Sequence, residues 1–119
     1  MINFIICEDD KITTKKIIDI IRKYMLLKKL NFNIGLVNDS AEGVIEYIEQ
    51  NSHKNNVYIL DIEINGDKNG MTLAKEIRNY DEDGEIIFLT SHTTMVMYVF
   101  KFKLKALDFI DKQDDIEKR

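Results

Sequence analysis

Short apolar runs that alternate with amphipathic segments limit the fold of this chain more than any other feature of its sequence. Residues 4–7, 57–62 and 85–90 form three largely apolar runs, and acidic or hydroxyl side chains stand at or just after their ends. Continuous apolar runs of this length are typical of strands that are buried on both faces of a sheet. The sequence therefore predicts three central strands of a parallel sheet.

Helical periodicity between these runs predicts the layers that cover the sheet. Residues 11–27 carry apolar side chains at helical spacing, with Lys and Arg between them, which indicates an amphipathic helix whose inner residues are Ile17, Ile18, Ile21 and Met25. The same patterns predict the other elements, which are a short edge strand over 33–37, a helix that begins at the capping residues Asp39 and Ser40, helices over 71–80 and 93–102, and a last strand over 106–110. This order predicts an α/β fold, a doubly wound five-stranded parallel sheet with helices on both faces.

Composition narrows the class of protein further. A length of 119 residues, 45% of them apolar, suits one domain with a single core. The net charge is −4 and Lys and Arg are spread along the chain, so we expect no direct contact with nucleic acid. The apolar run before the first acids is too short for a signal peptide or a membrane span, which predicts a cytoplasmic protein with no membrane partner. The lone Cys7 lies in an apolar run and is expected to be a buried thiol.

Side chains that can bind a ligand or take part in a reaction stand at the ends of the predicted strands. Because ligands of parallel sheets bind at the carboxyl ends of the strands, these side chains should converge on one edge. The residues concerned are Glu8, Asp9 and Asp10 at the end of the first strand, Asp61 at the end of the third, Thr90 and Ser91 at the end of the fourth, and Asp111 and Lys112 after the fifth. Any one acid after a strand is more often an ordinary solvated loop residue. Several neighbouring carboxylates, however, repel one another unless a divalent cation lies among them, and oxygen ligands suit Mg²⁺ or Mn²⁺.

Asp61 is the candidate nucleophile of this predicted metal site. A cation beside an aspartate can neutralise phosphate oxygens while the carboxylate attacks phosphorus, which gives an acyl phosphate. Lys112 could contact a phosphate oxygen as a point charge, and the Thr90 hydroxyl could donate a hydrogen bond to another. The pattern therefore predicts phosphoryl transfer to Asp61.

Five motifs in order carry a resemblance to a known family. They are IICEDD, LDIEINGDKNG with EIR after it, IIFLTSH and ALDFIDK. Together they resemble the receiver domain of two-component response regulators, and within that family the LytTR-type subgroup, such as the accessory gene regulator A family. The resemblance implies a flavodoxin-like fold and a sensor histidine kinase that phosphorylates Asp61.

The resemblance also implies a role for individual residues. Mg²⁺ would be held by Asp9 and Asp61, with Glu8 assisting through water and the backbone carbonyl of Glu63 as a further ligand. The residues that match the phosphate contacts and the switch are Thr90 (switch hydroxyl), Phe109 (switch aromatic) and Lys112 (phosphate-contacting lysine). Phosphorylation would then reshape the face formed by the fourth helix and the fifth strand, through which a homodimer could form. No catalysis is expected beyond phosphorylation and dephosphorylation of the chain itself.

Two departures from the family pattern concern the end of the chain. Gln113 follows Lys112, where receivers usually carry Pro. Only about six residues, 114–119, remain where the family has a fifth helix, so we expect that helix to be truncated. The chain is accordingly interpreted as one receiver domain over 1–119 that lacks its LytTR DNA-binding output domain.

Two alternative functions remain open at this stage. Glu8 after one strand, with Asp61 and Glu63 after another, also resembles the Mg²⁺ site of toprim-like or haloacid-dehalogenase-like enzymes that act on phosphoesters. Dehalogenases have their nucleophile after the first strand, Glu63 breaks the toprim acidic pair, and neither class explains Thr90 with Lys112. A pseudo-receiver that is not phosphorylated and acts as an interaction module is the second alternative, because of Gln113.

Overall fold

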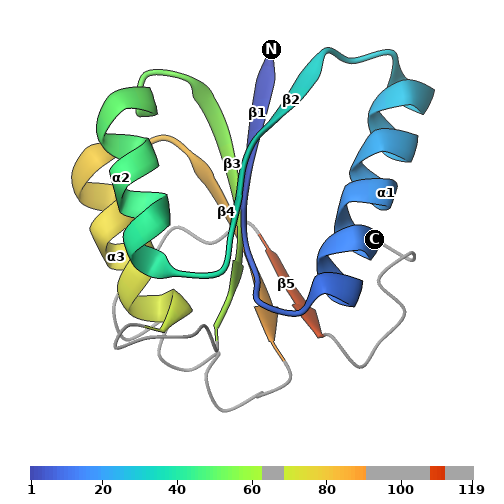
Figure 1. Cartoon of the computed structure of the whole chain (residues 1–119). Coiled ribbons are helices and arrows are strands. Elements are labelled where there is room, and N and C mark those ends of the chain that lie inside the picture. Colours follow the sequence, from blue (N-terminus) through green and yellow to red (C-terminus); the bar gives the residue numbers. More distant parts are fainter. Residues whose placement is uncertain (63–68, 91–107, 112–119) are drawn as a thin grey trace.

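A parallel sheet of five strands lies at the centre of the molecule, in the order β2-β1-β3-β4-β5 (Figure 1). The strands are β1 (Ile2–Cys7), β2 (Phe32–Asn38), β3 (Asn55–Asp61), β4 (Glu85–Thr90) and β5 (Asp108–Asp111). The structure is a computed structural model that describes residues 1–62, 69–90 and 108–111. The chain runs from β1 outward to β2 and then returns to β3 on the other side of β1, so the strand order reverses between β1 and β3. The predicted five-stranded parallel sheet is confirmed.

Helices cover both faces of this sheet. In Figure 1, α1 (Lys11–Lys28) lies on one face, and α2 (Ala41–Asn51) and α3 (Gly70–Tyr80) lie on the other. This is the doubly wound arrangement predicted from the alternation of strands and helices. The expected helix over 93–102 and the truncated fifth helix fall outside the described residues.

The two faces of the sheet carry separate apolar clusters. Every residue of β1 after Ile2 is buried, as expected of a central strand covered on both sides. Because successive side chains of a strand point to opposite faces, Ile5 joins the cluster beneath α2 and α3, whereas Ile6 joins the cluster beneath α1. Of the four predicted inner residues of α1, Ile17, Ile21 and Met25 are buried, and Ile18 is partly buried against the same cluster. The sheet thus divides the core into two layers.

Polar side chains begin each helix in the described part of the chain. An N-cap side chain satisfies one of the N–H groups that the first turn leaves without a partner. The accepted hydrogen bonds are Asp10 from Ile12 N at 3.0 Å, Ser40 from Gly43 N at 3.3 Å and Asn69 from Thr72 N at 2.9 Å. Ser40 confirms the cap predicted for α2. Asp10 also accepts from the Thr13 hydroxyl at 2.9 Å, so this third acid after β1 serves the start of α1.

A buried polar cluster ties β3 to the turn between α3 and β4. The hydroxyl of Tyr58, which is fully buried, donates to Asp81 Oδ2 at 2.6 Å. Asn56 Nδ2 donates to the same carboxylate oxygen at 3.1 Å. The other oxygen, Oδ1, accepts from the backbone N–H of Gly84 at 2.9 Å. This cluster lies at the amino ends of the strands and holds the α3–β4 turn against the sheet.

Replacement of Tyr58 by Phe is expected to lower the free energy of unfolding by about 2 kcal/mol, because the buried Asp81 carboxylate loses a hydrogen bond. Burial, and then the hydrogen bond to Asp81, raise the pKa of Tyr58. A raised pKa means that the stability from this group is fully present below the unfolded value of about 10 and is lost as the pH rises above it. The stability difference between wild type and variant should therefore narrow above about pH 10 in urea unfolding. A constant difference across that range would contradict this assignment.

Candidate metal centre

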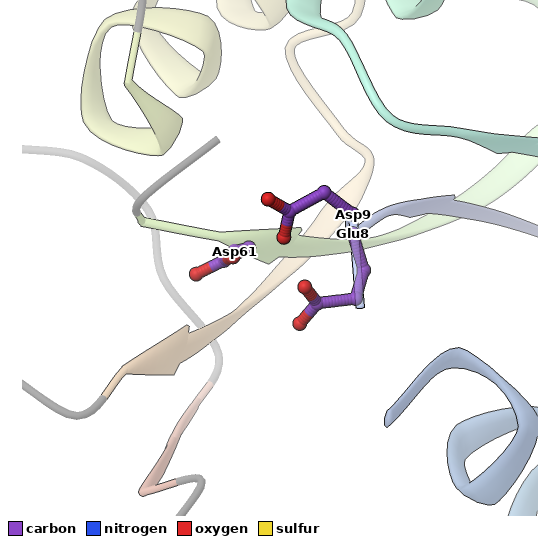
Figure 2. A group of neighbouring side chains, drawn as sticks. All are labelled: Glu8, Asp9 and Asp61. Atoms are coloured by element: carbon purple, nitrogen blue, oxygen red, sulfur yellow. The ribbon is translucent and has the colours of Figure 1, made fainter. Parts of the chain in front are cut away.

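Three carboxylates from two neighbouring strands lie together at the carboxyl edge of the sheet (Figure 2). Glu8 and Asp9 follow β1, and Asp61 ends β3. The parallel register pairs Cys7 with Leu60, so the next residues of both segments are neighbours. One carboxylate oxygen from each of the three lies within 4.8 Å of the others. We call Glu8, Asp9 and Asp61 the carboxylate group, and its proximity confirms the predicted convergence of these acids.

Burial distinguishes the members of the carboxylate group. Glu8 and Asp61 are each only 3% exposed, whereas Asp9 is exposed. Glu8 Oε2 accepts a hydrogen bond from the backbone N–H of Asp10 at 3.0 Å. Two buried carboxylates beside a third repel one another when ionised, and a cation between them would offset that repulsion.

The donor set of the carboxylate group suits a hard divalent cation. All the donors are carboxylate oxygens, which Mg²⁺ and Mn²⁺ prefer to nitrogen or sulfur ligands. Mg²⁺ is commonly held by one or two carboxylates and keeps its remaining positions for water and phosphate oxygens. The residues present therefore fit Mg²⁺ by chemistry and by separation.

The first turn of α3 packs directly on the backbone that carries Asp61. Gly70 N donates to the Ile62 carbonyl at 2.7 Å, and Ile62 N donates to the Leu89 carbonyl at 3.1 Å. A Cβ at position 70 would overlap the Asp61 carbonyl oxygen and lie 2.8 Å from Ile62 Cα. Only glycine allows this approach, so Gly70 helps to set the position of Asp61. The sequence analysis did not single it out, although an Asn-Gly pair at the end of a polar loop is a signal for a turn.

Cys7 lies immediately before the carboxylate group and is fully buried. Burial, and then the negative charges of Asp61 and Glu8, raise the pKa of its thiol to about 12. The buried thiol predicted from the sequence is confirmed. Because the thiolate is the reactive form, this cysteine should be inert in the folded protein.

Thiol labelling is expected to separate the folded from the unfolded protein through Cys7. At mildly alkaline pH the native chain should react with a disulfide reagent at least about a hundredfold more slowly than the chain in denaturant, because the thiol is both covered and protonated. The reagent's absorbance during native and denatured reactions measures the two rates. A native rate equal to the denatured rate would show that Cys7 is open to solvent.

The other predicted site residues are described in part or not at all. The register pairs Asp61 with Leu89 and Thr90 with Asp111, so the backbone of Thr90 stands one residue beyond the partner of Asp61. The backbone of Phe109 pairs with Phe88 in β5 and β4. The side chains of Thr90 and Phe109, and the whole of Glu63 and Lys112, fall outside the described residues. Their roles stay predictions.

A groove of about 620 Å³ opens beside the carboxylate group, between α1 and the end of β2. Its lining includes Glu8 and Asp9 together with the cations Lys11, Lys15 and Arg22. Solvent and anionic groups can therefore reach the carboxylate group from this side.

Among the described residues, none of the helices combines the length and apolarity needed to cross a membrane.

Comparison with known sequences places these features in a family. The model of the response regulator receiver domain matches residues 4–118. Accessory gene regulator protein A from Staphylococcus aureus (strain N315) is 38% identical over 116 residues, which cover 96% of this chain and 48% of that protein. The protein of the same name from Staphylococcus epidermidis is 36% identical over 114 residues, which cover 94% of this chain and 47% of its own. The chain thus spans about half the length of the curated relatives it matches.

Solved structures support the same fold. A DNA-binding response regulator of the LuxR family from Staphylococcus aureus superposes with a TM-score of 0.76 at 23% identity, covering 99% of this chain and 92% of that one. A chain of the CheX-CheY-BeF3-Mg+2 complex from Borrelia burgdorferi gives a TM-score of 0.75 at 23% identity, with 98% and 82% covered. These similarities confirm the flavodoxin-like receiver fold, and the family match favours a regulatory protein over the phosphoesterase alternatives. The chain belongs to the response regulator receiver domain family, as a receiver similar to the LytTR-type accessory gene regulator A proteins.

Proposed function

We propose that this receiver accepts a phosphoryl group on Asp61 from a sensor histidine kinase in the presence of Mg²⁺. The observation that carries the proposal is the carboxylate group, in which the buried Asp61 lies within 4.8 Å of Glu8 and Asp9 at the edge of the sheet. An ordinary solvated aspartate has no use for two further carboxylates beside it. A nucleophile that reacts beside a cation requires them, because they help to hold the cation.

Each member of the carboxylate group has a distinct part in this reaction. Asp9 and Asp61, with Glu8 through water and the carbonyl of Glu63, would hold Mg²⁺, which supplies charge neutralisation for the phosphate oxygens. An Asp61 carboxylate oxygen attacks phosphorus, the P–N bond of the kinase phosphohistidine breaks, and an acyl phosphate forms on Asp61. The rigid backbone of β3 keeps the carboxylate oriented for attack.

The phosphorylated aspartate then acts as a switch. The added charge draws the Thr90 hydroxyl and the Lys112 ammonium toward the phosphate, and Phe109 turns inward. The face formed by β5 and the helix expected over 93–102 would change shape and support a homodimer. A transcriptional response would pass from this face to a LytTR DNA-binding domain outside the receiver.

Incubation with acetyl phosphate and Mg²⁺ tests the proposal directly. Intact-mass measurement should show one added phosphoryl group that forms only with Mg²⁺ and is removed by hydroxylamine, as expected of an acyl phosphate. Beryllofluoride with Mg²⁺ should change the NMR shifts of residues around Asp61. A wild-type chain that shows neither response would be a pseudo-receiver, whereas steady turnover of a free phosphoester would favour the enzyme alternative.

A further inference from the structure

Large apolar side chains are exposed at the carboxyl end of α1, far from the carboxylate group. Leu26 is 80% exposed and Leu27 is 76% exposed, although the adjoining Met25 is buried in the core. The segment, which we call the α1 tip, consists of the apolar residues Tyr24, Leu26, Leu27 and Leu30 and the cations Arg22, Lys23, Lys28 and Lys29. Single exposed apolar residues are normal on protein surfaces, but four large ones within residues 24–30, each at least 46% exposed, can form a binding surface.

The α1 tip is positively charged within a chain that is negative overall. Its four Lys and Arg side chains are all exposed, and residues 20–38 contain no Asp or Glu. The whole chain carries a net charge of −4. The tip therefore combines apolar area with a local positive potential that would attract an anionic partner.

The backbone of the α1 tip is fixed by hydrogen bonds. Lys29 N donates to the Leu26 carbonyl at 3.2 Å, and Leu30 N donates to the Met25 carbonyl at 3.0 Å. Lys29 itself adopts the left-handed conformation, with φ of 56°. These bonds are those of the Schellman motif, which ends a helix with a defined geometry. The exposed leucines thus project from an ordered end of α1.

The position of the α1 tip leaves the carboxylate group accessible. α1 begins just after Asp9 and contains 18 residues, so its two ends are separated by about 27 Å. Figure 1 shows the carboxyl end of α1 beside the amino ends of β1 and β2, at the opposite end of the sheet from the carboxylate group. A partner bound at Leu26 and Leu27 would leave the carboxylate group uncovered, and Arg22 is the tip residue that also lines the groove beside that group.

The shape and charge of the α1 tip discriminate among possible partners. A second copy that met the tip with its own tip would bring eight cations together. Nucleic acid would leave the leucines against a polar backbone. Leu26 and Leu27 point about 100° apart around the helix, so they cannot both enter one narrow groove of a partner protein.

We propose that the α1 tip binds the surface of an anionic lipid bilayer. A bilayer surface can receive both leucines in its interfacial region while Arg22, Lys23, Lys28 and Lys29 meet the anionic headgroups. Such contact lies in the plane of the interface and needs no membrane-spanning helix. The sequence analysis expected no membrane partner because the first apolar run is too short for a signal peptide or a membrane span. Binding to a bilayer surface requires neither, so the proposal departs from that expectation. It uses the unphosphorylated chain and does not depend on phosphoryl transfer.

Sedimentation with lipid vesicles tests the proposal. The full chain should bind vesicles that contain phosphatidylglycerol and should not bind vesicles of phosphatidylcholine alone, and added salt should weaken the binding. Two double variants, Leu26→Ser with Leu27→Ser and Lys28→Glu with Lys29→Glu, should each lower the bound fraction by at least about tenfold. All four positions are exposed, so circular dichroism should show an unchanged fold.

A matched control uses the other end of the same helix. Lys15→Glu with Lys16→Glu makes the same change of charge at exposed positions outside the α1 tip and should lower binding by no more than about twofold. An equal loss of vesicle binding in this control would overturn the proposal. A wild-type chain that does not bind anionic vesicles would also overturn it. If the chain does not bind vesicles but binds an acidic amphipathic peptide through the α1 tip, the tip is a docking surface for a protein and the lipid proposal is wrong.

Discussion

Replacement of Asp61 by Asn should abolish both the phosphoryl modification and the stabilisation by Mg²⁺, while the fold is retained. Asparagine has nearly the same volume, so it fits a position that is 3% exposed, but its amide is not a nucleophile and carries no charge for a cation. Mg²⁺ at about 100 times its dissociation constant should add about 2.7 kcal/mol to the unfolding free energy of the wild type, and nothing comparable to the variant. Urea unfolding with Mg²⁺ or with a chelator, together with intact mass after acetyl phosphate treatment, measures both effects.

Asp39→Asn provides the matched control for this experiment. Asp39 is exposed just after β2, so the substitution makes the same change of charge near the same edge of the sheet but outside the carboxylate group. This control should keep both the modification and the response to Mg²⁺. If Asp61→Asn still became phosphorylated, the acceptor would be another residue. If it kept its stabilisation by Mg²⁺, Asp61 would not be a ligand.

Gly70→Ala is expected to damage the fold and the metal centre together. The added Cβ would overlap the Asp61 carbonyl oxygen, and neither the start of α3 nor β3 can move aside without shifting backbone. Overpacking of this kind should lower the unfolding free energy by about 3 kcal/mol. Because the displaced backbone carries Asp61, we also expect Mg²⁺ affinity and phosphorylation rate to fall by at least about tenfold, as small displacements of reacting groups have large effects on rate. Mg²⁺ titration and single-turnover phosphorylation of the folded variant measure these losses.

Gly43→Ala separates the effect on the site from general loss of stability. Gly43 also lies in the first turn of a helix, but a Cβ there would meet the side chain of Asn38, which can rotate. That rotation would cost the hydrogen bond from Ser40 N to Asn38 Oδ1, at 2.8 Å, and so would also destabilise the protein. Mg²⁺ affinity should nevertheless stay unchanged in Gly43→Ala. Equal losses of affinity in both variants would mean that Gly70 acts only through stability.

The strands could be predicted from the sequence because burial on both faces gives continuous apolar runs. The run at 85–90 matches β4 residue for residue, and the helix expected over 71–80 begins one residue earlier, at Gly70. β3 begins at Asn55, two residues before the predicted start. Asn56 is polar and lies outside the predicted apolar run, yet it is buried and donates to Asp81, which is distant in the sequence. Such tertiary pairing of polar groups leaves no local pattern in the sequence.

The same limit applies to the candidate metal centre. Glu8, Asp9 and Asp10 look equivalent as three consecutive acids, and only the structure separates the buried Glu8 and the exposed Asp9 from Asp10, which caps α1. The convergence with Asp61 could be predicted because parallel strands share one carboxyl edge. Gly70 could not, because its requirement is a contact between α3 and β3 rather than a chemical property of glycine.

The reversal of strand order between β1 and β3 gives a cation at this edge a mechanical consequence. After Glu8 and Asp9 the chain enters α1 on one face of the sheet, whereas α3, on the opposite face, begins against the backbone of Asp61. An ion held by Asp9 and Asp61 would link the segment that leads into α1 with the backbone on which α3 packs. Binding of the ion should therefore slow amide hydrogen exchange in the first turns of both α1 and α3. Amides on opposite faces of the sheet would then be protected by the same bound ion.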